Sequence, residues 1–304
     1  MGRVGRRQFL IVTSAILAAP LARAQPAGKV HRVALVLLSA PVSDMAGLDP
    51  IHPLPRAFFH ELRDLGYVEG RNLVLERRPL DGKVERAGEV VAEVLRFKPD
   101  VIVSASNQIT RAAKDATTSV PIVMAGNVAP VESALVRSLA HPGGNVTGLS
   151  YGDGPVVEGK RLSLLKEAVP GISRVAFVGS DYLWEVAATK HVRTMTQTLG
   201  LQLFHAAFKG HDVAPALATV PKEHAEAMFV ATEVSTYHKR HRIIEFAAET
   251  RRSASYGHQE AVEDGGLMSY SMKATDVYRR AAGKRQRCGR TSKDCQLPLR
   301  TANR

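Results

Sequence analysis

At 304 residues, the chain is long enough for two domains that each have a hydrophobic core. Hydrophobic residues make up 45% of it and charged residues 23%, which is typical of globular proteins. The formal net charge is +12, but residues 1–24 carry +4 and residues 283–304 carry +6, so residues 25–282 carry only +2. A nucleic-acid-binding protein needs a basic face on its folded body, and this distribution gives no support for that function.

The first 24 residues have the layout of an export signal. Arg6-Arg7 precedes an apolar stretch from Phe9 to Leu21, which is too short for a comfortable transmembrane span. Ala22-Arg23-Ala24 then matches a small-x-small cleavage site, with no cysteine nearby to carry a lipid anchor. The arginine pair fits a twin-arginine signal, and general secretory signals can begin in the same way. We therefore predict a signal peptide over 1–24 and an exported, periplasmic protein.

Short apolar runs alternate with helical patterns through the first half of the chain. The run from Arg32 to Ser39, followed by Ala40-Pro41, is typical of a buried parallel strand. Apolar residues recur at helical spacing between such runs, and Gly66 closes the first helical pattern. The expected strands are 32–39, 73–76, 101–104 and 121–124, and the expected helices are 56–65, 84–97, 109–116 and 133–140.

The same alternation restarts after the middle of the chain. Strands that alternate with helices in this way predict parallel sheets built from right-handed βαβ units, here as two doubly wound α/β lobes. The expected strands are 174–178, 201–204, 227–231, 254–256 and 267–271, and the expected helices are 158–169, 184–199, 213–220, 237–249 and 275–282.

The segment from His141 to Tyr151 lies between the two patterns and is rich in turn-forming residues. Gly143, Gly144 and Gly148 can adopt backbone angles that are closed to other residues. We interpret this segment as a hinge crossing between the lobes, and the alternative is an ordinary loop within one domain. The domains expected are lobe 1 over 25–147, lobe 2 over 148–266, a return segment toward lobe 1 over 267–282 and an atypical, disordered basic tail over 283–304.

Polar side chains follow the carboxyl ends of the expected strands, where open α/β sheets bind ligands. The segment that includes Ser106 and Asn107 opens a helix, whose free N–H groups favour a carboxylate by roughly 0.3–1 kcal/mol. The alternative for either residue is plain capping of that helix. Tyr182 offers a flat apolar wall, whereas the spacing of Trp184 favours a core position.

Motifs for catalysis, cofactors and metals are missing from the sequence. The chain has no G-x-S-x-G elbow, no phosphate-binding P-loop, no H-E-x-x-H and no G-x-G-x-x-G after the first strand. His238 and His241 could face one metal ion, but Lys239-Arg240 between them favours a solvated basic face. The two cysteines, Cys288 and Cys295, do not have the spacing of a structural zinc site. We therefore expect no cofactor, no metal and no catalytic residues.

Several motifs in order along the chain resemble those of the substrate-binding proteins of ABC importers, in the family whose better-known members bind tryptophan and related amino acids. The most specific motifs are Leu65-Gly66-Tyr67-Val68-Glu69-Gly70-Arg71-Asn72, His141-Pro142-Gly143-Gly144-Asn145-Val146-Thr147-Gly148 and Gly265-Gly266-Leu267-Met268-Ser269-Tyr270. The resemblance covers roughly residues 5–282. The chain departs from the family pattern after Ala282, where the basic tail fits a frameshift or a truncation, and the alternative is a solvated tail peculiar to this protein.

The resemblance implies a periplasmic-binding-protein-like fold of type I, with two Rossmann-like lobes that close on a small ligand. It also implies a monomer that delivers an amino-acid-like or carboxylate ligand to an ABC permease in the inner membrane, with no nucleic-acid partner. The ligand-binding residues that it implies are Ser39, Ser106, Asn107, Gln108, Asn127, Tyr151, Asp181, Tyr182, Glu233 and His258.

Two other functions are compatible with an α/β fold. An effector-sensing domain of a regulator shares the two-lobe architecture, but residues 1–30 hold an export signal in place of a DNA-binding motif. An exported α/β hydrolase would need the nucleophile elbow that the sequence lacks. We therefore favour a solute receptor, with the identity of its ligand left open.

Overall fold

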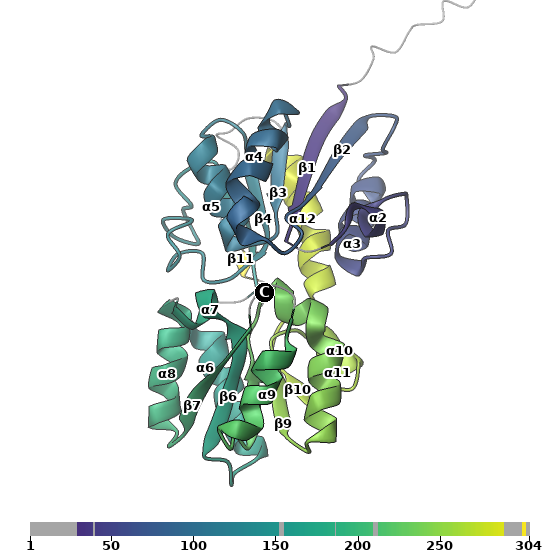
Figure 1. Cartoon of the computed structure of the whole chain (residues 1–304). Helices are drawn as coiled ribbons and strands as arrows, with labels where there is room; N and C mark the ends of the chain where they lie inside the picture. The colour runs from purple at the N-terminus through teal and green to yellow at the C-terminus, as the bar shows by residue number, and fades with distance from the viewer. Residues whose placement is uncertain are drawn as a thin grey trace, which may run out of the picture. The chain divides into compact units, whose positions relative to one another are not determined.

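The computed structural model describes residues 29–38, 40–151, 155–185, 187–208, 212–288 and 300–301 (Figure 1). The predicted signal peptide over 1–24 and the predicted ligand residue Ser39 therefore lie outside the described residues. Two parallel β-sheets lie in the unit that runs from His31 to Arg304. Among the described residues, none of the helices combines the length and the hydropathy required to span a lipid bilayer.

The first sheet is entirely parallel and has the strand order β11-β5-β4-β3-β1-β2. Its strands are β1 (His31–Leu37), β2 (Leu73–Pro79), β3 (Val101–Ser104), β4 (Ile122–Asn127), β5 (Val146–Ser150) and β11 (Arg300–Thr301). The helices of this half are α2 (Val42–Met45), α3 (Pro53–Asp64), the 3-10 helix η1 (Val84–Arg86), α4 (Ala87–Arg96), α5 (Asn107–Ala116) and α12 (Ala274–Cys288).

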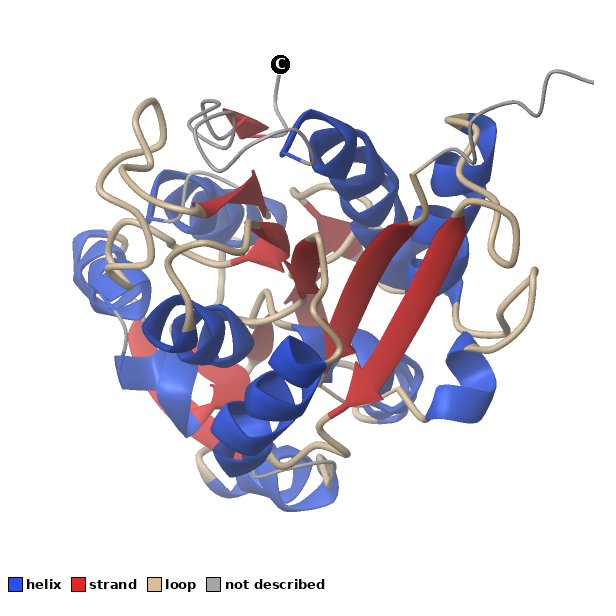
Figure 2. Cartoon of the chain, turned by 90° about the horizontal axis from the view of Figure 1, so that it is seen from above, coloured by secondary structure: helices blue, strands red, loops and turns tan. Residues whose placement is uncertain are grey.

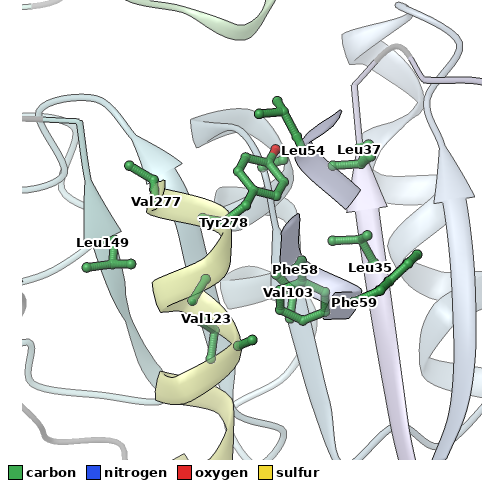
Figure 3. Close-up of a cluster of buried hydrophobic side chains, with 14 of the residues drawn as sticks. Leu35, Leu37, Leu54, Phe58, Phe59, Val103, Val123, Leu149, Val277 and Tyr278 are labelled. Atoms are coloured by element: carbon green, nitrogen blue, oxygen red, sulfur yellow. The ribbon is translucent and has the colours of Figure 1, made fainter. Parts of the chain in front are cut away.

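Alternate side chains of the buried strands supply two cores, one on each face of the first sheet. Leu35 of β1 packs with Phe58 of α3 and Tyr278 of α12 on one face (Figure 3). Val36, the next residue of β1, packs with Val91 of α4 on the other face. A strand that is buried on both faces must be apolar throughout, which explains the continuous apolar runs of the sequence.

The second sheet is also parallel and has the order β10-β9-β8-β6-β7. Its strands are β6 (Arg174–Ser180), β7 (Gln202–Phe208), β8 (Ala227–Val230), β9 (Ser253–Tyr256) and β10 (Met268–Ser269). Its helices are α6 (Pro155–Ala168), α7 (Asp181–Glu185), α8 (Ala187–Thr198), α9 (Ala214–Lys222), α10 (Val234–Glu249) and α11 (Glu260–Glu263). Helices lie on both sides of the strands, so the predicted fold of two Rossmann-like α/β lobes with parallel sheets, periplasmic-binding-protein-like type I, is confirmed (Figure 2).

The crossing between the sheets lies later in the chain than the sequence predicted. β5 pairs with β4 as far as Ser150, so the expected boundary at 147 cuts through a strand of the first sheet. Gly143 and Gly144 precede this strand, and Gly148 lies inside it. A Cβ on Gly148 would lie 2.3 Å from the carbonyl oxygen of Met124. Gly148 therefore allows β4 and β5 to approach closely. The hinge interpretation is wrong for these glycines, because all three lie before the end of β5 and so before the crossing.

The segment Ser133–Ala140 is not the predicted helix. It consists of turns and bends, and Ala134 within it and Ala129 before it have left-handed φ angles of 52° and 44°. Leu135 and Val136 are nevertheless buried against the first sheet. The apolar spacing that suggested a helix therefore comes from side chains, such as Leu135 and Val136, with which an irregular segment packs on the sheet. The described part of the expected helix over 184–199 lies in α7 and α8, and residue 186 between them lies outside the described residues.

The C-terminal segment returns to the first sheet. β10 still belongs to the second sheet, and α12 begins at Ala274 and buries Val277 and Tyr278 in the core of the first. α12 extends to Cys288, and β11 pairs with β5 at the edge of the first sheet, so the expectation of a disordered tail from 283 is wrong for these residues. Residues 289–299 and 302–304 of the predicted tail lie outside the described residues.

Candidate functional site

A cavity of about 460 Å³ is lined by residues from both halves of the chain. Nearly all of its lining residues follow the carboxyl ends of strands, as expected for a ligand site in open α/β sheets. They are Leu38 after β1, 82–85 after β2, 105–108 after β3, Gly126 and Val128 at the end of β4, 180–183 at the end of β6, Phe208 at the end of β7, and 233–235 after β8.

The N-terminus of α5 supplies free N–H groups to the cavity. Ser106 is the N-cap residue, and its hydroxyl accepts a hydrogen bond from the N–H of Ile109 at 3.2 Å. The N–H groups of Asn107 and Gln108 lie in the first turn, where no acceptor exists within the helix. Both residues line the cavity. Because the helix dipole is positive at this end, the site favours an anion.

The side chain of Asn107 holds the cavity wall together. Its amide nitrogen donates to the carbonyl of Val128 at 2.7 Å, and its amide oxygen accepts from the N–H of Val128 at 3.1 Å. The same nitrogen lies 3.4 Å from the hydroxyl of Tyr182, which belongs to the other half of the chain. The capping alternative is thus confirmed for Ser106, and the Asn107 side chain fixes the turn after β4.

Glu233 brings a carboxylate to the opposite wall of the cavity. It accepts hydrogen bonds from the backbone N–H and the hydroxyl of Ser180 at 2.8 and 2.7 Å. Burial raises the pKa of Glu233, while the bonds from Ser180 and Ser235 oppose the rise. No ion pair with Glu233 occurs among the residues that the structure describes. A cationic group of a ligand would give this half-buried carboxylate the countercharge it lacks.

The remaining walls are mostly apolar. Tyr182 presents its ring at an exposure of 39%, and Phe208 is buried at 4%. Lys83, Glu85 and Asp181 are exposed and also line the cavity. The cavity thus combines a positive helix end, a negative side chain and aromatic surface, which suits a small ligand with several kinds of group.

Three of the predicted ligand residues lie away from this cavity. The amide nitrogen of Asn127 donates to the hydroxyl of Thr110 at 2.8 Å, and Asn127 is 1% exposed. Tyr151 and His258 contact each other edge to face, with ring centroids 5.0 Å apart, and both are buried. The structure brings together at the cavity the predicted residues Ser106, Asn107, Gln108, Asp181, Tyr182 and Glu233.

The sequence interpretation missed other lining residues, mainly those of 82–85 and Phe208. Residues 82–85 follow β2 and Phe208 ends β7, and both strands run longer than their apolar patterns suggested. β2 continues to Pro79, and Asp81-Gly82 then turns the chain with two left-handed φ angles of 52° and 75°. The Asp-Gly pair was a turn signal that could have placed this loop beside the others.

A buried arginine supports the segment that carries Glu233. Arg161 of α6 is 0% exposed and pairs with Glu158 at 2.6 Å. Its guanidinium donates to the hydroxyl of Thr232 at 3.1 Å and to the carbonyls of Val230 and Ser255 at 2.7 and 2.9 Å. Arg161 therefore ties the ends of β8 and β9 together directly beside Glu233.

The sequence model of a family described as ABC transporter substrate binding protein matches residues 54–288. The chain belongs to this family. A tyrosine-binding protein of Clostridioides difficile is 31% identical over 123 residues, which are 40% of this chain and 35% of that protein. The match therefore spans about a third of the length of that relative.

Two solved structures show the same fold as this family member. A conserved domain protein of Vibrio cholerae has a TM-score of 0.75 at 21% identity, and the match covers 90% of each chain. An ABC domain from Streptococcus pneumonia, solved in complex with L-Trp, has a TM-score of 0.73 at 18% identity, with 89% of this chain and 88% of that chain covered. The family assignment and the fold agree with the resemblance that the sequence motifs carry.

Proposed function

We propose that this chain is a solute receptor of an ABC importer and binds a small amino-acid-like or carboxylate ligand in the cavity between its two α/β halves. The observation that carries the proposal is the pairing of two unlike groups in one cavity. The N-terminus of α5 favours an anion, and Glu233 offers a carboxylate that has no cationic partner among the described residues.

An α-amino acid fits both groups at once. Its carboxylate would accept hydrogen bonds from the N–H groups of Asn107 and Gln108, which favour an anion by up to ~2 kcal/mol in a partly buried site. Its ammonium group would pair with Glu233. Its side chain would lie among Tyr182, Phe208 and the other apolar lining residues. A volume of about 460 Å³ is large enough for a small molecule of this kind.

The relatives support an aromatic side chain. One is a tyrosine-binding protein, and one solved structure holds L-Trp. We propose an aromatic amino acid as the first ligand to test. The alternative ligand is a simple aromatic carboxylate without an ammonium group.

The cellular setting is part of the same proposal. Residues 1–24 would direct export by a twin-arginine or general secretory route, and the mature chain would act in the periplasm as a monomer. It would deliver its ligand to a permease in the inner membrane, without catalysis. Among the described residues, no group of three or more histidine, cysteine, aspartate or glutamate side chains could hold a metal ion.

Isothermal calorimetry with amino acids and their des-amino analogues tests the proposal. We expect an aromatic amino acid to bind more tightly than its des-amino analogue, and Glu233→Gln to remove most of that difference. Glu226→Gln is the matched control, because Glu226 also accepts hydrogen bonds from a serine N–H and hydroxyl, those of Ser173 at 2.5 and 3.0 Å. Glu226 lies outside the lining of the cavity. Equal binding of both ligand types would contradict the pairing of an ammonium group with Glu233, and no binding of either type by the folded protein would contradict the proposal as a whole.

A further inference from the structure

His258 forms a hydrogen bond to the backbone of Glu233, the residue whose carboxylate we propose to bind the ligand. It lies in the turn between β9 and α11 and is 3% exposed. Its Nε2 lies 3.0 Å from the carbonyl oxygen of Glu233. A carbonyl oxygen only accepts hydrogen bonds, so Nε2 carries the hydrogen and donates it. Burial lowers the pKa of His258 to about 4, which keeps the ring neutral at neutral pH.

The turn that carries His258 packs directly on the segment that carries Glu233. A Cβ on Gly257 would lie 2.6 Å from the Cα of Thr232 and 2.7 Å from the carbonyl oxygen of Ala231. The two backbones are therefore in contact, and only glycine fits between them. A displacement of His258 would be passed on to Glu233.

The other edge of the His258 ring contacts the first half of the chain. Tyr151, which directly follows β5, packs on it edge to face, with the ring planes at 75°. The Tyr151 ring in turn lies against Gly126, where an added Cβ would come within 2.4 Å of the ring carbons. Gly126 lines the cavity. Tyr151 and His258 thus form a continuous contact from Gly126 in one wall to Glu233 in the other.

We propose that His258 is a positioning residue for ligand binding: through its bond to Glu233 and its packing on Tyr151, it fixes the Glu233 carboxylate relative to the wall formed by the first sheet. This inference rests on the proposed function, because it assigns to His258 a role in presenting Glu233 to the ligand ammonium group. The groups that carry this role are the Nε2–H of His258 and the contacting rings of His258 and Tyr151. The Nδ1 atom of His258 and the hydroxyl of Tyr151 have no hydrogen-bond partner among the described residues.

These contacts define a matched set of variants. His258→Phe keeps a ring and removes the donor. His258→Gln keeps a donor at the level of Nε2, and His258→Asn places its amide at the level of Nδ1, too short to reach Glu233. Tyr151→Phe keeps the ring that contacts His258, and Tyr151→Ala removes it.

Calorimetry with L-tyrosine and with 3-(4-hydroxyphenyl)propanoate, which lacks the amino group, measures the effect. We expect His258→Phe and His258→Asn to weaken L-tyrosine binding by about 3- to 10-fold, the effect of one lost hydrogen bond. The des-amino probe should change less than about 2-fold, and His258→Gln should restore L-tyrosine binding. In the background of Glu233→Gln, the effect of His258→Phe should disappear.

Amide hydrogen exchange provides a readout that needs no ligand. We expect His258→Phe and Tyr151→Ala to speed exchange in residues 231–236, and His258→Gln and Tyr151→Phe to leave it unchanged. Three outcomes would overturn the inference. His258→Phe could weaken the binding of both probes equally, or His258→Gln could bind L-tyrosine as weakly as His258→Phe does. The third outcome is that amide exchange in residues 231–236 stays unchanged in His258→Phe and Tyr151→Ala. A failure of the proposed function has a different signature: Glu233→Gln would then bind both probes as the unaltered protein does, or neither probe would bind.

Discussion

The backbone N–H and the side-chain hydroxyl of Ser180 both donate to the carboxylate of Glu233, at 2.8 and 2.7 Å. Ser180 ends β6 and Glu233 follows β8, so one residue of the cavity wall orients another across two neighbouring strands. Hydrogen bonds to an ionised carboxylate stabilise the charged form, and burial destabilises it. The charge that Glu233 can offer to a ligand therefore depends on Ser180.

This dependence predicts how ligand affinity changes with pH. An ammonium group needs the ionised form of Glu233, so affinity should be lost as pH falls through the pKa of Glu233 in the free protein. Burial raises that pKa above its ordinary value, so the loss should begin at a higher pH than for an exposed glutamate. Ser180→Ala removes a donor to the ionised form and should move the loss to still higher pH.

Calorimetric titrations over roughly pH 4 to 8 measure this effect. Ser173→Ala is the control, because Ser173 makes the equivalent bonds to Glu226. An affinity profile that is the same for Ser180→Ala and for the unaltered protein would show that Glu233 does not bind the ammonium group.

Trp184 should report ligand binding by its fluorescence. It is the one tryptophan of the sequence and lies in α7, whose residues Asp181, Tyr182 and Leu183 line the cavity. Its indole stacks on the ring of His205, with centroids 4.5 Å apart and planes at 5°. A ligand that contacts Tyr182 should change this environment, so we expect the emission to shift in intensity or wavelength.

The titration should use a ligand without an indole ring, with selective excitation of tryptophan. The fluorescence change should saturate at the same ligand concentration as the heat measured by calorimetry, and Trp184→Phe should abolish it. An emission spectrum that stays constant at ligand saturation would mean that α7 does not respond to the ligand.

The sequence predicted those structural features that depend on residues close together in the chain. The run Val101–Ser104 forms β3, and all four of its residues are buried. Three consecutive apolar residues in this run indicated a parallel strand that is buried on both faces. Polar loops after the strands led to Ser106 and Glu233, because parallel strands bring their carboxyl ends to one edge.

What the sequence could not show depends on contacts between distant residues. Tyr151 and His258 are polar residues in plausible positions, yet each is covered by a segment remote in the chain, Gly126 for Tyr151 and Glu233 for His258. No local pattern distinguishes a ring that faces a ligand from a ring that packs behind the wall of its cavity. The same limit applied to Gly148, whose neighbour Met124 is visible only once β4 and β5 are paired.

Gly148→Ala should destabilise the fold and leave no defect that is specific to ligand binding. Gly148 has a φ of 139°, and its added Cβ would lie 2.3 Å from backbone atoms of Met124, which cannot move aside as a flexible side chain could. We expect a loss of roughly 1–3 kcal/mol in the free energy of unfolding. Gly144→Ala is the control, because nothing lies within 4 Å of its added Cβ.

Urea denaturation and calorimetry together distinguish the two roles. A hinge role would lower affinity in Gly148→Ala while the unfolding midpoint stayed constant. The structure predicts the reverse, a lower midpoint with affinity unchanged in the fraction that remains folded.

Arg161→Ala should be among the most destabilising substitutions in this half of the chain. It would leave Glu158 without the cation it pairs with, and it would remove the buried hydrogen bonds from Arg161 to the carbonyls of Val230 and Ser255. Removal of one partner from a buried ion pair typically costs about 3–5 kcal/mol. Arg242→Ala is the control: Arg242 is 51% exposed and pairs with Glu245 at 3.4 Å, so its loss should cost less than about 1 kcal/mol.

The variant Arg161→Lys separates charge from geometry. A lysine keeps the positive charge but cannot donate in the planar pattern with which the guanidinium reaches Thr232, Val230 and Ser255. We expect an unfolding midpoint between those of Arg161→Ala and the unaltered protein, together with faster amide exchange around Glu233. A midpoint equal to that of the unaltered protein would mean that the charge alone, set against Glu158, is what the fold requires at this position.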